Sequence, residues 1–434
     1  MERVNNVAEV IWIGPFKRNF VSNESVGVPF YSSSTMLKLD AKAETFLSQK
    51  YTKGLQRLLI PKDSILISCS GTIGNVCIAT DDLEGKALTQ DAIRVVSTDV
   101  LLKANIFCFL QSQAGQYLLT TSKSGGVIEH IYANDIESLS MPLLPSGLRS
   151  RLSSLIERCS KKRVEANRKL KFAESEVYQQ LYIDQSCFVK DSASNGNVVY
   201  FNDIASPSFG IHHRLDATYF DKKCHRIRML VNEKGKGQTI SSLGCKVILH
   251  GKTFIPGIHK VQANFGVPYF TGKELFATRL IPRTFIYSDN HQHLRKLTVD
   301  KGTVLVTCAG TIGRVAYVYG PLENVTVTHD AIRVVASDKI YSGYLFAYLN
   351  SHLGQIQLKQ SSYGSVIPRL HSDHIEAIKV AVPNDAGESI SNIVDEAFEL
   401  RREAHEAENQ AIQLFEMAIQ RGRELTEAEW GSEY

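Results

Sequence analysis

The sequence predicts an α+β fold: two repeated mixed α/β domains separated by two long helices that form an antiparallel coiled coil. Three observations lead to this prediction, namely an internal repeat at a constant offset, a heptad pattern after each copy, and opposite charge on the two heptad segments. The 434 residues give room for two or three domains, and 43% hydrophobic and 22% charged residues are ordinary for a globular protein.

The internal repeat keeps one register without a gap. Ser68–Gly74 (SCSGTIG) recurs as Thr307–Gly313 (TCAGTIG), and Thr89–Val96 (TQDAIRVV) recurs as Thr328–Val335 (THDAIRVV). In both cases the second segment follows the first by 239 positions (307 − 68 = 328 − 89 = 239). A register shared between such distant segments indicates a duplicated domain.

Each copy reads as a mixture of strands and helix. Apolar runs around the Gly-Thr-Ile-Gly turn predict strands, and helical spacing of apolar residues predicts a helix in a longer segment. The second copy repeats the order of the first from Thr303 to Pro383. In the first copy we expect strands at 64–68, 76–79 and 92–96, a helix at 106–119, and a closing strand with prolines at 136–144.

A heptad pattern follows each copy, after Pro145 and after Pro383. Alternating steps of three and four residues over several heptads predict a coiled-coil seam, and only Arg163 interrupts the apolar stripe. The first stripe is Leu152, Ile156, Cys159, Ala166, Leu170, Ala173 and Val177, and the second is Ile393, Ala397, Leu400, Ala404, Ala407, Ala411, Leu414 and Ala418.

The charges on the two heptad segments favour pairing between them. The first segment is mainly basic between Arg149 and Lys171, and the second is mainly acidic between Glu388 and Glu408. Opposite charges beside a seam favour the mixed pair over either self-pair. An alternative stays open, in which each helix is solvated and packs only on its own domain; the basic helix could also contact DNA.

Composition also restricts location and chemistry. There is no apolar run of about 18 residues, and the N-terminus lacks the basic and apolar pattern of a secretory signal. The 8 cysteines form no Cys-x-x-Cys pair, so we expect reduced thiols in a cytoplasmic protein without structural zinc. The formal net charge of +4 permits nucleic-acid binding but does not require it.

Four segments together resemble the specificity subunits of type I restriction-modification enzymes. Leu66–Asn75 (LISCSGTIGN) and Leu305–Arg314 (LVTCAGTIGR) resemble the strand–Gly-Thr-Ile-Gly–strand element of that family. Tyr363–Leu370 (YGSVIPRL), followed by a proline and a long helix, is similar to the close of a target-recognition domain, and Arg214–Phe220 (RLDATYF) to its opening. Each motif is weak alone, whereas their order and duplication are fairly specific.

The resemblance implies a sequence-specific DNA-binding subunit that reads a bipartite DNA site and takes part in phage defence. It implies two target-recognition domains and helices that dock a separate DNA adenine methyltransferase, with a restriction or effector subunit as a further partner. The chain itself would be non-catalytic and hold no cofactor, because S-adenosylmethionine would bind the methyltransferase. The expected boundaries are domain 1 at 1–145, helix 1 at 146–185, domain 2 with an N-terminal extension at 186–384, helix 2 at 385–425 and a tail at 426–434.

Two features depart from the family pattern. Asn197–Lys252 has no counterpart before the first copy, where only about a dozen residues precede Trp12. Ser146–Arg149 replaces the usual acidic-Gln start of the helix. A diverged member from a related defence system is therefore a second interpretation.

Polar and aromatic residues near the repeated turns are the candidate DNA contacts. Ser, Thr, Lys, Arg and Tyr donors suit phosphates and groove edges, and these loops differ between the copies while the scaffold agrees. The alternatives are tight turns at Gly71–Gly74 and Gly310–Gly313, and solvated loops elsewhere. The candidates are Lys17, Arg18, Thr72, Asn75, Ser122, Lys123, Ser124, His130, Tyr132, His259, Lys260, Thr311, Arg314, Ser361, Ser362, Tyr363, Arg369 and His371.

Other polar motifs have a different expected role or none. Asp91–Arg94 and Asp330–Arg333 would hold the scaffold through an Asp–Arg pair or backbone capping. His212–His213 and Asp289–His293 do not recur in the first copy, so no metal site is expected. Methyltransferase, phosphate-loop and nuclease motifs are absent from the sequence. Two rival functions stay open: the targeting half of a cryptic DNA-modifying enzyme, and an assembly scaffold that does not bind DNA.

Overall fold

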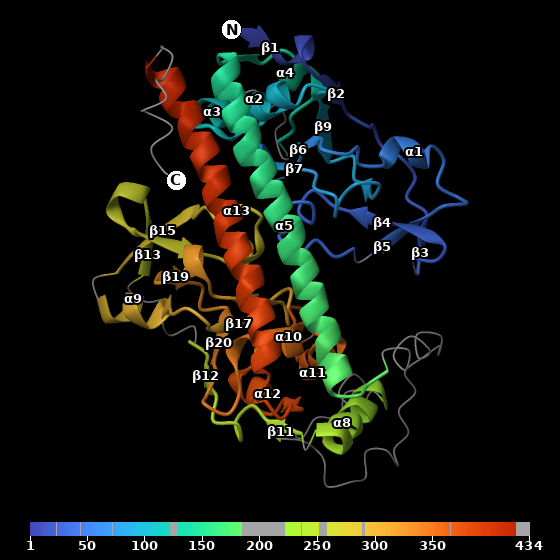
Figure 1. Cartoon of the computed structure of the whole chain (residues 1–434), viewed down its shortest axis with the longest axis vertical. Helices are drawn as coiled ribbons and strands as arrows, with labels where there is room; N and C mark the ends of the chain where they lie inside the picture. The colour runs from blue at the N-terminus through green and yellow to red at the C-terminus, as the bar shows by residue number, and fades with distance from the viewer. Residues whose placement is uncertain are drawn as a thin grey trace. The chain divides into compact units, whose positions relative to one another are not determined.

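The computed structural model divides into two compact units. Unit 1 comprises Met1–Glu165, Ala277–Arg279 and Glu403–Tyr434, and unit 2 comprises Ala166–Phe276 and Leu280–Arg402. The two long helices, α5 (Ser146–Gln180) and α13 (Glu388–Arg421), each contribute to both units (Figure 1). The structure describes the chain except residues 23, 44, 72, 122–128, 185–221, 236, 251–257, 289–290, 365 and 422–434.

The main sheet of unit 1 is antiparallel, in the order β2–β9–β6–β7. All four residues of β6 are buried, as expected for an apolar central strand. The strands predicted at 64–68, 76–79 and 92–96 are confirmed. The bounds are β2 (Glu9–Ile11), β6 (Ile65–Ser68), β7 (Val76–Ile78) and β9 (Ala92–Val96).

The helix predicted at 106–119 is in fact two helices, α2 (Val100–Gln111) and α3 (Gln113–Thr121). Ser112 between them is extended, and its hydroxyl donates to Phe109 O and accepts from Gly115 N. A Cβ on Gly115 would lie 1.9 Å from that Phe109 oxygen. The corner therefore requires a glycine, and apolar spacing alone does not reveal the break.

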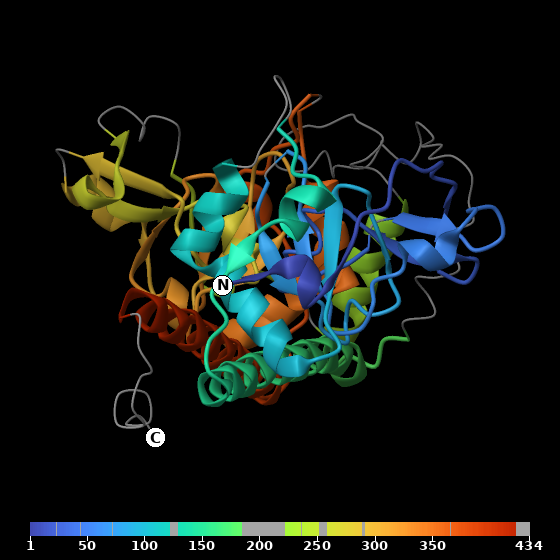
Figure 2. The ribbon, with the colours of Figure 1, turned by 90° about the horizontal axis from the view of Figure 1, so that it is seen from above.

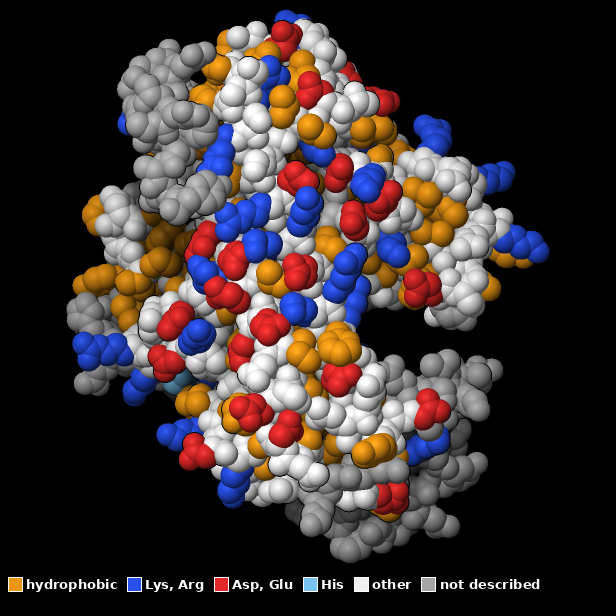
Figure 3. All heavy atoms as spheres, in the orientation of Figure 1, with side chains coloured by type: hydrophobic (Ala, Val, Ile, Leu, Met, Phe, Trp, Pro, Cys, Tyr) orange, Lys and Arg blue, Asp and Glu red, His pale blue; other side chains and the backbone are white. Residues whose placement is uncertain are grey.

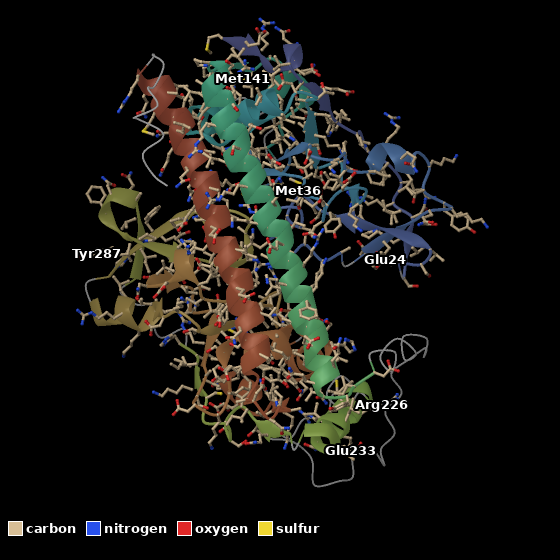
Figure 4. The ribbon with its side chains drawn as sticks, in the orientation of Figure 1. Glu24, Met36, Met141, Arg226, Glu233 and Tyr287 are labelled. Atoms are coloured by element: carbon tan, nitrogen blue, oxygen red, sulfur yellow. The ribbon has the colours of Figure 1, made fainter. Side chains whose placement is uncertain are left out.

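A second, smaller sheet in unit 1, drawn in blue in Figure 2, lies in the N-terminal part of the chain. Its strand order is β3–β5–β4–β8, with β4 and β8 parallel. It has its own small core, which includes Phe30 and Leu47. Met36 and Met141, labelled in Figure 4, are completely buried in the larger cores of this unit. The bounds are β3 (Phe20–Val21), β4 (Gly27–Tyr31), β5 (Thr45–Ser48), α1 (Leu55–Leu58) and β8 (Ala87–Leu88).

The closing segment of the first copy differs from the prediction. The expected strand at 136–144 begins instead in a short helix, α4 (Ala133–Glu137), in which Asp135 accepts from Tyr132 N. Only β10 (Ser140–Met141) is extended, and it pairs with β1 (Glu2–Arg3).

Unit 2 repeats this architecture, which confirms the duplicated mixed α/β domain. Its sheets have the orders β12–β20–β17–β18 and β13–β15–β14–β19–β16, and β11 pairs with β21. The bounds are β11 (Gln238–Thr239), β12 (Lys246–Ile248), β13 (Ile258–Val261), β14 (Val267–Phe270), β15 (Thr284–Ser288), α9 (His291–Leu297), β16 (Thr298–Val299), β17 (Val304–Thr307), β18 (Val315–Tyr317), β19 (Val325–Val327), β20 (Ala331–Val335), α10 (Ser342–Asn350), α11 (His352–Gln360), α12 (Ser372–Glu376) and β21 (Lys379–Val380).

The expectation that Asn197–Lys252 lacks a counterpart is wrong for its last part. Strand β11 pairs with β21 as β1 pairs with β10, and β12 pairs with β20 as β2 pairs with β9. The registers match Glu9 with Lys246 and Glu2 with Gln238, so the offset is 237 positions (246 − 9) and 236 positions (238 − 2) here instead of 239. A search at the constant offset therefore does not find these short strands. The extra described element is α8 (Lys222–Gly235), which buries Ile227 and Val231 in the core of unit 2.

Each unit packs a part of both long helices into its core. In unit 1, Leu152 and Ile156 of α5 share a core with Ala411 and Phe415 of α13. In unit 2, Val177 of α5 shares a core with residues such as Val394 and Phe398 of α13. Most of the predicted stripe is buried, but Leu170, Ile393 and Leu400 are only partly so, and Val394, Phe398 and Phe415 lie at core positions that the heptads missed.

The charge complementarity predicted for the helices is confirmed within each unit. In unit 1, the carboxylate of Glu403 forms ion pairs with Arg158, at 4.0 Å, and with Lys162. In unit 2, Lys169 lies 2.7 Å from Glu396. Figure 3 shows basic and acidic side chains interspersed over these helices.

Arg163 is the residue that interrupts the apolar stripe of α5, and in unit 1 it forms a buried ion pair with Glu408 of α13. Its guanidinium donates to both carboxylate oxygens of Glu408, at 3.1 and 2.8 Å, and to Thr278 O at 2.7 Å. Glu408 is 2% exposed. A buried bidentate pair of this kind stabilises only while both partners are present.

We expect Glu408→Leu to lower the free energy of unfolding by about 3–5 kcal/mol, because it leaves the Arg163 charge buried without its carboxylate. Arg163→Met together with Glu408→Leu should recover most of this loss. Denaturant unfolding of the full chain measures both, with Glu396→Ala at the more exposed Lys169 pair as a control that changes little. A single variant as stable as the wild type would contradict this role.

Candidate nucleic-acid interface

Three loops of unit 1 meet at one end of the main sheet. Strands β2 and β6 both run antiparallel to β9, so their ends lie beside its beginning. Cys69, after β6, donates its backbone N–H to Asp91 O at 3.0 Å, and Ile131 N donates to Cys69 O at 3.0 Å. The loop that carries Asn75 and the loop that carries His130 and Tyr132 are thereby joined to the turn at Asp91 by backbone hydrogen bonds.

Unit 2 builds the same cluster. Cys308 N donates to Asp330 O at 3.0 Å, and Leu370 N donates to Cys308 O at 2.9 Å. Isolated bridges pair Ser70 with His130 in unit 1 and Ala309 with Arg369 in unit 2. Both units therefore present their candidates on one common scaffold.

The Gly-Thr-Ile-Gly segments are tight turns in both units. Gly71 and Gly74 have φ values of 71° and 77°, and Gly310 and Gly313 of 71° and 74°. This left-handed region favours glycine, so the tight-turn interpretation is confirmed. Thr72 lies outside the described residues, and Thr311 is exposed.

A glutamine fixes each turn to the helix corner behind it. Gln116 Nε2 donates to Gly74 O at 2.9 Å and to Leu110 O at 2.7 Å. Gln355 Nε2 donates to Gly313 O and to its own corner, Leu349 O, both at 2.8 Å. Gln116 and Gln355 are also separated by the offset of the repeat (355 − 116 = 239), and each positions the turn of its own unit.

The Asp–Arg pairs expected within Asp91–Arg94 and Asp330–Arg333 are wrong, although a scaffolding role for the arginines is supported. Arg94 is 1% exposed and donates to Leu58 O at 2.9 Å and to Leu88 O at 3.4 Å. Arg333 is 3% exposed and likewise donates only to backbone oxygens among the described residues. Burial lowers the pKa of each guanidinium to about 10.

Asp91 faces a different partner, Arg18. Asp91 Oδ2 lies 3.7 Å from Arg18 Nη2, and it accepts from Thr89 Oγ1 at 2.8 Å. The Arg18 guanidinium carbon lies 6.0 Å and 5.5 Å from the ring centroids of Phe16 and Phe30. Lys17 beside it is exposed.

Exposed rings line the rest of the unit 1 cluster. Trp12 Nε1 donates to Gln90 O at 2.9 Å, and the Trp12 ring meets that of Tyr132 edge-on at 6.4 Å. Tyr132 also stacks with His130 at 6.3 Å. Trp12 is 40% and Tyr132 49% exposed. Rings and imidazoles at this position suit contact with bases.

The unit 2 cluster has different side chains on the same loops. Tyr363 and Arg369 exchange two backbone hydrogen bonds, at 3.0 and 2.7 Å, and the Tyr363 ring lies 5.5 Å from that of His374. His371 Nδ1 lies 3.3 Å from Asp373. The Arg314 guanidinium carbon lies 3.6 Å from the ring centroid of Phe276.

Several candidates lie away from these clusters or point into the fold. His259 and Lys260 are exposed on β13, where His259 is opposite Tyr287, a half-exposed residue labelled in Figure 4. The amide of Asn75 and the hydroxyls of Ser361 and Ser362 bond inside the fold, to Ser68, Gln357 O and Lys359 O respectively. Ser122, Lys123 and Ser124 lie outside the described residues.

Sequence reasoning missed Trp12, Tyr287, and the Tyr269–His329 contact, in which the hydroxyl lies 3.3 Å from Nδ1. His329 could have been found, because it replaces Gln90 inside the otherwise repeated Thr-x-Asp-Ala-Ile-Arg segment. Trp12 carries no such signal: it is a single aromatic residue outside the repeated register.

Two further properties of the described residues concern membrane-spanning helices and clusters of metal ligands. No helix there is long and apolar enough to cross a membrane. Nor do three or more His, Cys, Asp or Glu side chains gather there as metal ligands would. His212–His213 lie outside the described residues, as do Asp289 and the side chains of His291 and His293.

Comparison with known proteins identifies one family model, described as the type I restriction modification DNA specificity domain, which matches residues 3–147 and 245–414. Three solved structures are similar to the chain: the type I restriction-modification S subunit from M. genitalium (12% identity, 98% of this chain and 96% of that chain, TM-score 0.32), the HsdS subunit from Thermoanaerobacter tengcongensis (15%, 100% and 96%, 0.28), and a structure from work on type I R-M complex assembly (14%, 97% and 96%, 0.28). Comparison with curated proteins gives no match.

The thiols at the centre of the clusters are expected to be unreactive. Burial raises the pKa of Cys69 to about 12 and that of Cys308 to about 11, so both stay protonated at neutral pH. Cys187 lies outside the described residues, whereas the seven described cysteines are buried, so the test uses a Cys187→Ser background. We expect this folded chain to react slowly with a disulfide reagent at pH 8 and completely once unfolded. Because the folded pKa values are raised, these thiols should reduce stability as the pH rises from about 9 towards 12. Fast labelling of Cys69 at pH 8 would contradict the packing.

Proposed function

Because the chain belongs to the type I restriction modification DNA specificity family and is a DNA-recognition specificity subunit, we propose that it reads a bipartite DNA site and directs a separate DNA adenine methyltransferase to it. The observation that carries the proposal is the duplicated loop cluster around Cys69 and Cys308, built on one scaffold with different exposed side chains. Two similar reading surfaces with unlike chemistry suit two different half-sites.

Within each cluster we assign different roles to the repeated and the variable residues. Gln116 and Gln355 position the turns identically and carry no sequence information. At the variable positions, His130 of unit 1 corresponds to Arg369 of unit 2, and Tyr132 corresponds to His371. Base edges would be read by such variable residues, and phosphates by exposed lysines and hydroxyls such as Lys17, Lys260 and Thr311.

We further propose that α5 and α13 form one antiparallel coiled coil that spaces the two reading surfaces and docks the methyltransferase. The ion pairs inside each unit support it, because partners further along α5 meet residues earlier in α13, as in Arg163–Glu408 and Lys169–Glu396. The chain would contribute recognition alone, with S-adenosylmethionine bound by the methyltransferase. A restriction or effector subunit would be a further partner of the complex, in the cytoplasm.

The DNA-reading proposal is tested by sequencing the methylated adenines of cells with and without this gene. We expect the bipartite methylation motif to disappear on deletion. Replacing the loop around Ser124 by the loop around Tyr363 should then change one half of the motif only. A motif that persists after deletion, or an exchange that alters both halves, would contradict the proposal.

The coiled-coil proposal is tested by Ala404→Leu and Ala411→Leu, because both alanines are 0% exposed. Overpacking there should destabilise the protein by about 1–3 kcal/mol for each substitution and weaken methyltransferase binding. Gln413→Leu, at an exposed position of the same helix, is the matched control. Unchanged unfolding and unchanged co-purification with the methyltransferase would argue against a close helix pair.

A further inference from the structure

We propose that Arg18 reads a guanine in the half-site bound by unit 1, and that unit 2 has no equivalent contact. The inference rests on the proposed reading of one half-site by each unit. It deepens that proposal by naming a base and the side chain that selects it.

The Arg18 side chain is held in place by two aromatic rings and remains accessible. Phe16 and Phe30 lie 6.0 and 5.5 Å from its guanidinium carbon, and Phe30 itself is buried in the core of the small sheet. The side chain is still 38% exposed. An arginine supported by rings loses little conformational freedom when it binds a planar acceptor.

The polar contacts of Arg18 leave most of its donors for a ligand. Nη2 lies 3.5 Å from Thr89 Oγ1 and 3.7 Å from Asp91 Oδ2. Among the described residues, neither Nε nor Nη1 donates a hydrogen bond. Guanine presents O6 and N7 side by side in the major groove, and an arginine fork matches them with two hydrogen bonds. Thr89 and Asp91 would orient the fork without occupying it.

The position of Arg18 places it at the reading surface. Thr89 and Asp91, which hold it, flank Gln90, whose carbonyl accepts from Trp12. The same turn is fixed to Cys69 by a backbone hydrogen bond. Arg18 and the exposed Trp12 are therefore attached to one rigid turn, as a base-reading group requires.

The strand register shows what occupies this position in unit 2. Phe20 of β3 is opposite Leu47, and Lys260 of β13 is opposite Ile286, which follows Leu47 by 239 positions (286 − 47 = 239). Two residues before Lys260, at the position that matches Arg18, stands Ile258. An isoleucine cannot donate to a base edge, so the contact belongs to one half-site only.

The ring that supports Arg18 also changes between the units. Phe30 corresponds to Tyr269 at the common offset (269 − 30 = 239), and the Tyr269 hydroxyl lies 3.3 Å from Nδ1 of His329. His329 in turn replaces Gln90. Unit 2 thus has a Tyr–His contact where unit 1 has a ring-supported arginine.

The competing role for Arg18 is a phosphate contact, for which charge alone is enough. Arg18→Lys separates the two roles, because lysine keeps the charge but loses the two-pronged planar donor. Loss of a phosphate contact weakens binding to all sequences alike, whereas loss of a base contact relaxes one position of the motif.

The test uses the full chain with its methyltransferase in cells and reads the methylation motif. For Arg18→Lys we expect one guanine position to become degenerate in one half of the motif, with the other half unchanged. Asp91→Asn should relax the same position less, and the adjacent Lys17→Gln should keep the motif intact. A variant motif identical to the wild type, or a change in both halves, would overturn the proposal.

A second measurement removes the acceptor instead of the donor. Replacing that guanine by 7-deazaguanine, which lacks N7, should weaken binding of the wild-type complex to duplex DNA about 10-fold, and should not weaken the Arg18→Lys complex further. Equal losses for both proteins would overturn the proposal. The proposed function is tested by a different result: it is contradicted if deletion of the gene leaves the wild-type methylation motif in place.

Discussion

Each unit depends on one buried arginine between its two sheets. Arg94 extends from β9 of the main sheet and donates to Leu88 O in β8 of the small sheet. Arg333 in β20 does the same to Val327 O in β19. Burying a guanidinium is costly, and the bonds from Arg94 Nη2 and Arg333 Nη2 to backbone oxygens offset part of that cost while they join the two sheets.

The consequence for recognition is direct, because the turn Thr89–Asp91 connects β8 to β9 and so bridges the sheets that Arg94 joins. That turn holds Trp12 through Gln90 O and orients Arg18 through Thr89 and Asp91. Its equivalent, Thr328–Asp330, holds His329 beside Tyr269. In the proposed reading surfaces, the side chains at these turns differ between the units while the buried arginine is the same.

Much of the fold could be predicted from the sequence, because its signal lies in buried strands and in a repeat with a constant offset. The repeat located the tight turns and the three strands of the first copy correctly. It failed where geometry is decided by a few atoms: the corner at Ser112 depends on Gly115 approaching the Phe109 carbonyl. It also failed for β11 and β12, whose pairing is repeated at offsets of 236 (238 − 2) and 237 (246 − 9) positions instead of 239.

The candidate site was harder to predict for a different reason. From the sequence, an Asp91–Arg94 pair was one of two expected scaffold contacts, beside backbone capping. In the structure Asp91 instead forms an ion pair with Arg18, on a loop that precedes it by more than 70 positions. Residues such as Trp12 belong to the site only because β2 ends beside the start of β9. Proximity of this kind follows from strand order and has no local pattern.

The composition of unit 1 has a consequence for synthesis of the chain. Its core includes Ala411, Leu414 and Phe415 of α13, and the backbone N–H of Gln113 donates to Glu416 at 2.8 Å. The ribosome makes these partners long after the first 165 residues have emerged. The domain that is translated first therefore cannot complete its core until α13 has been synthesised. Until then, the apolar residues that pack against α13 stay uncovered while unit 2 is translated.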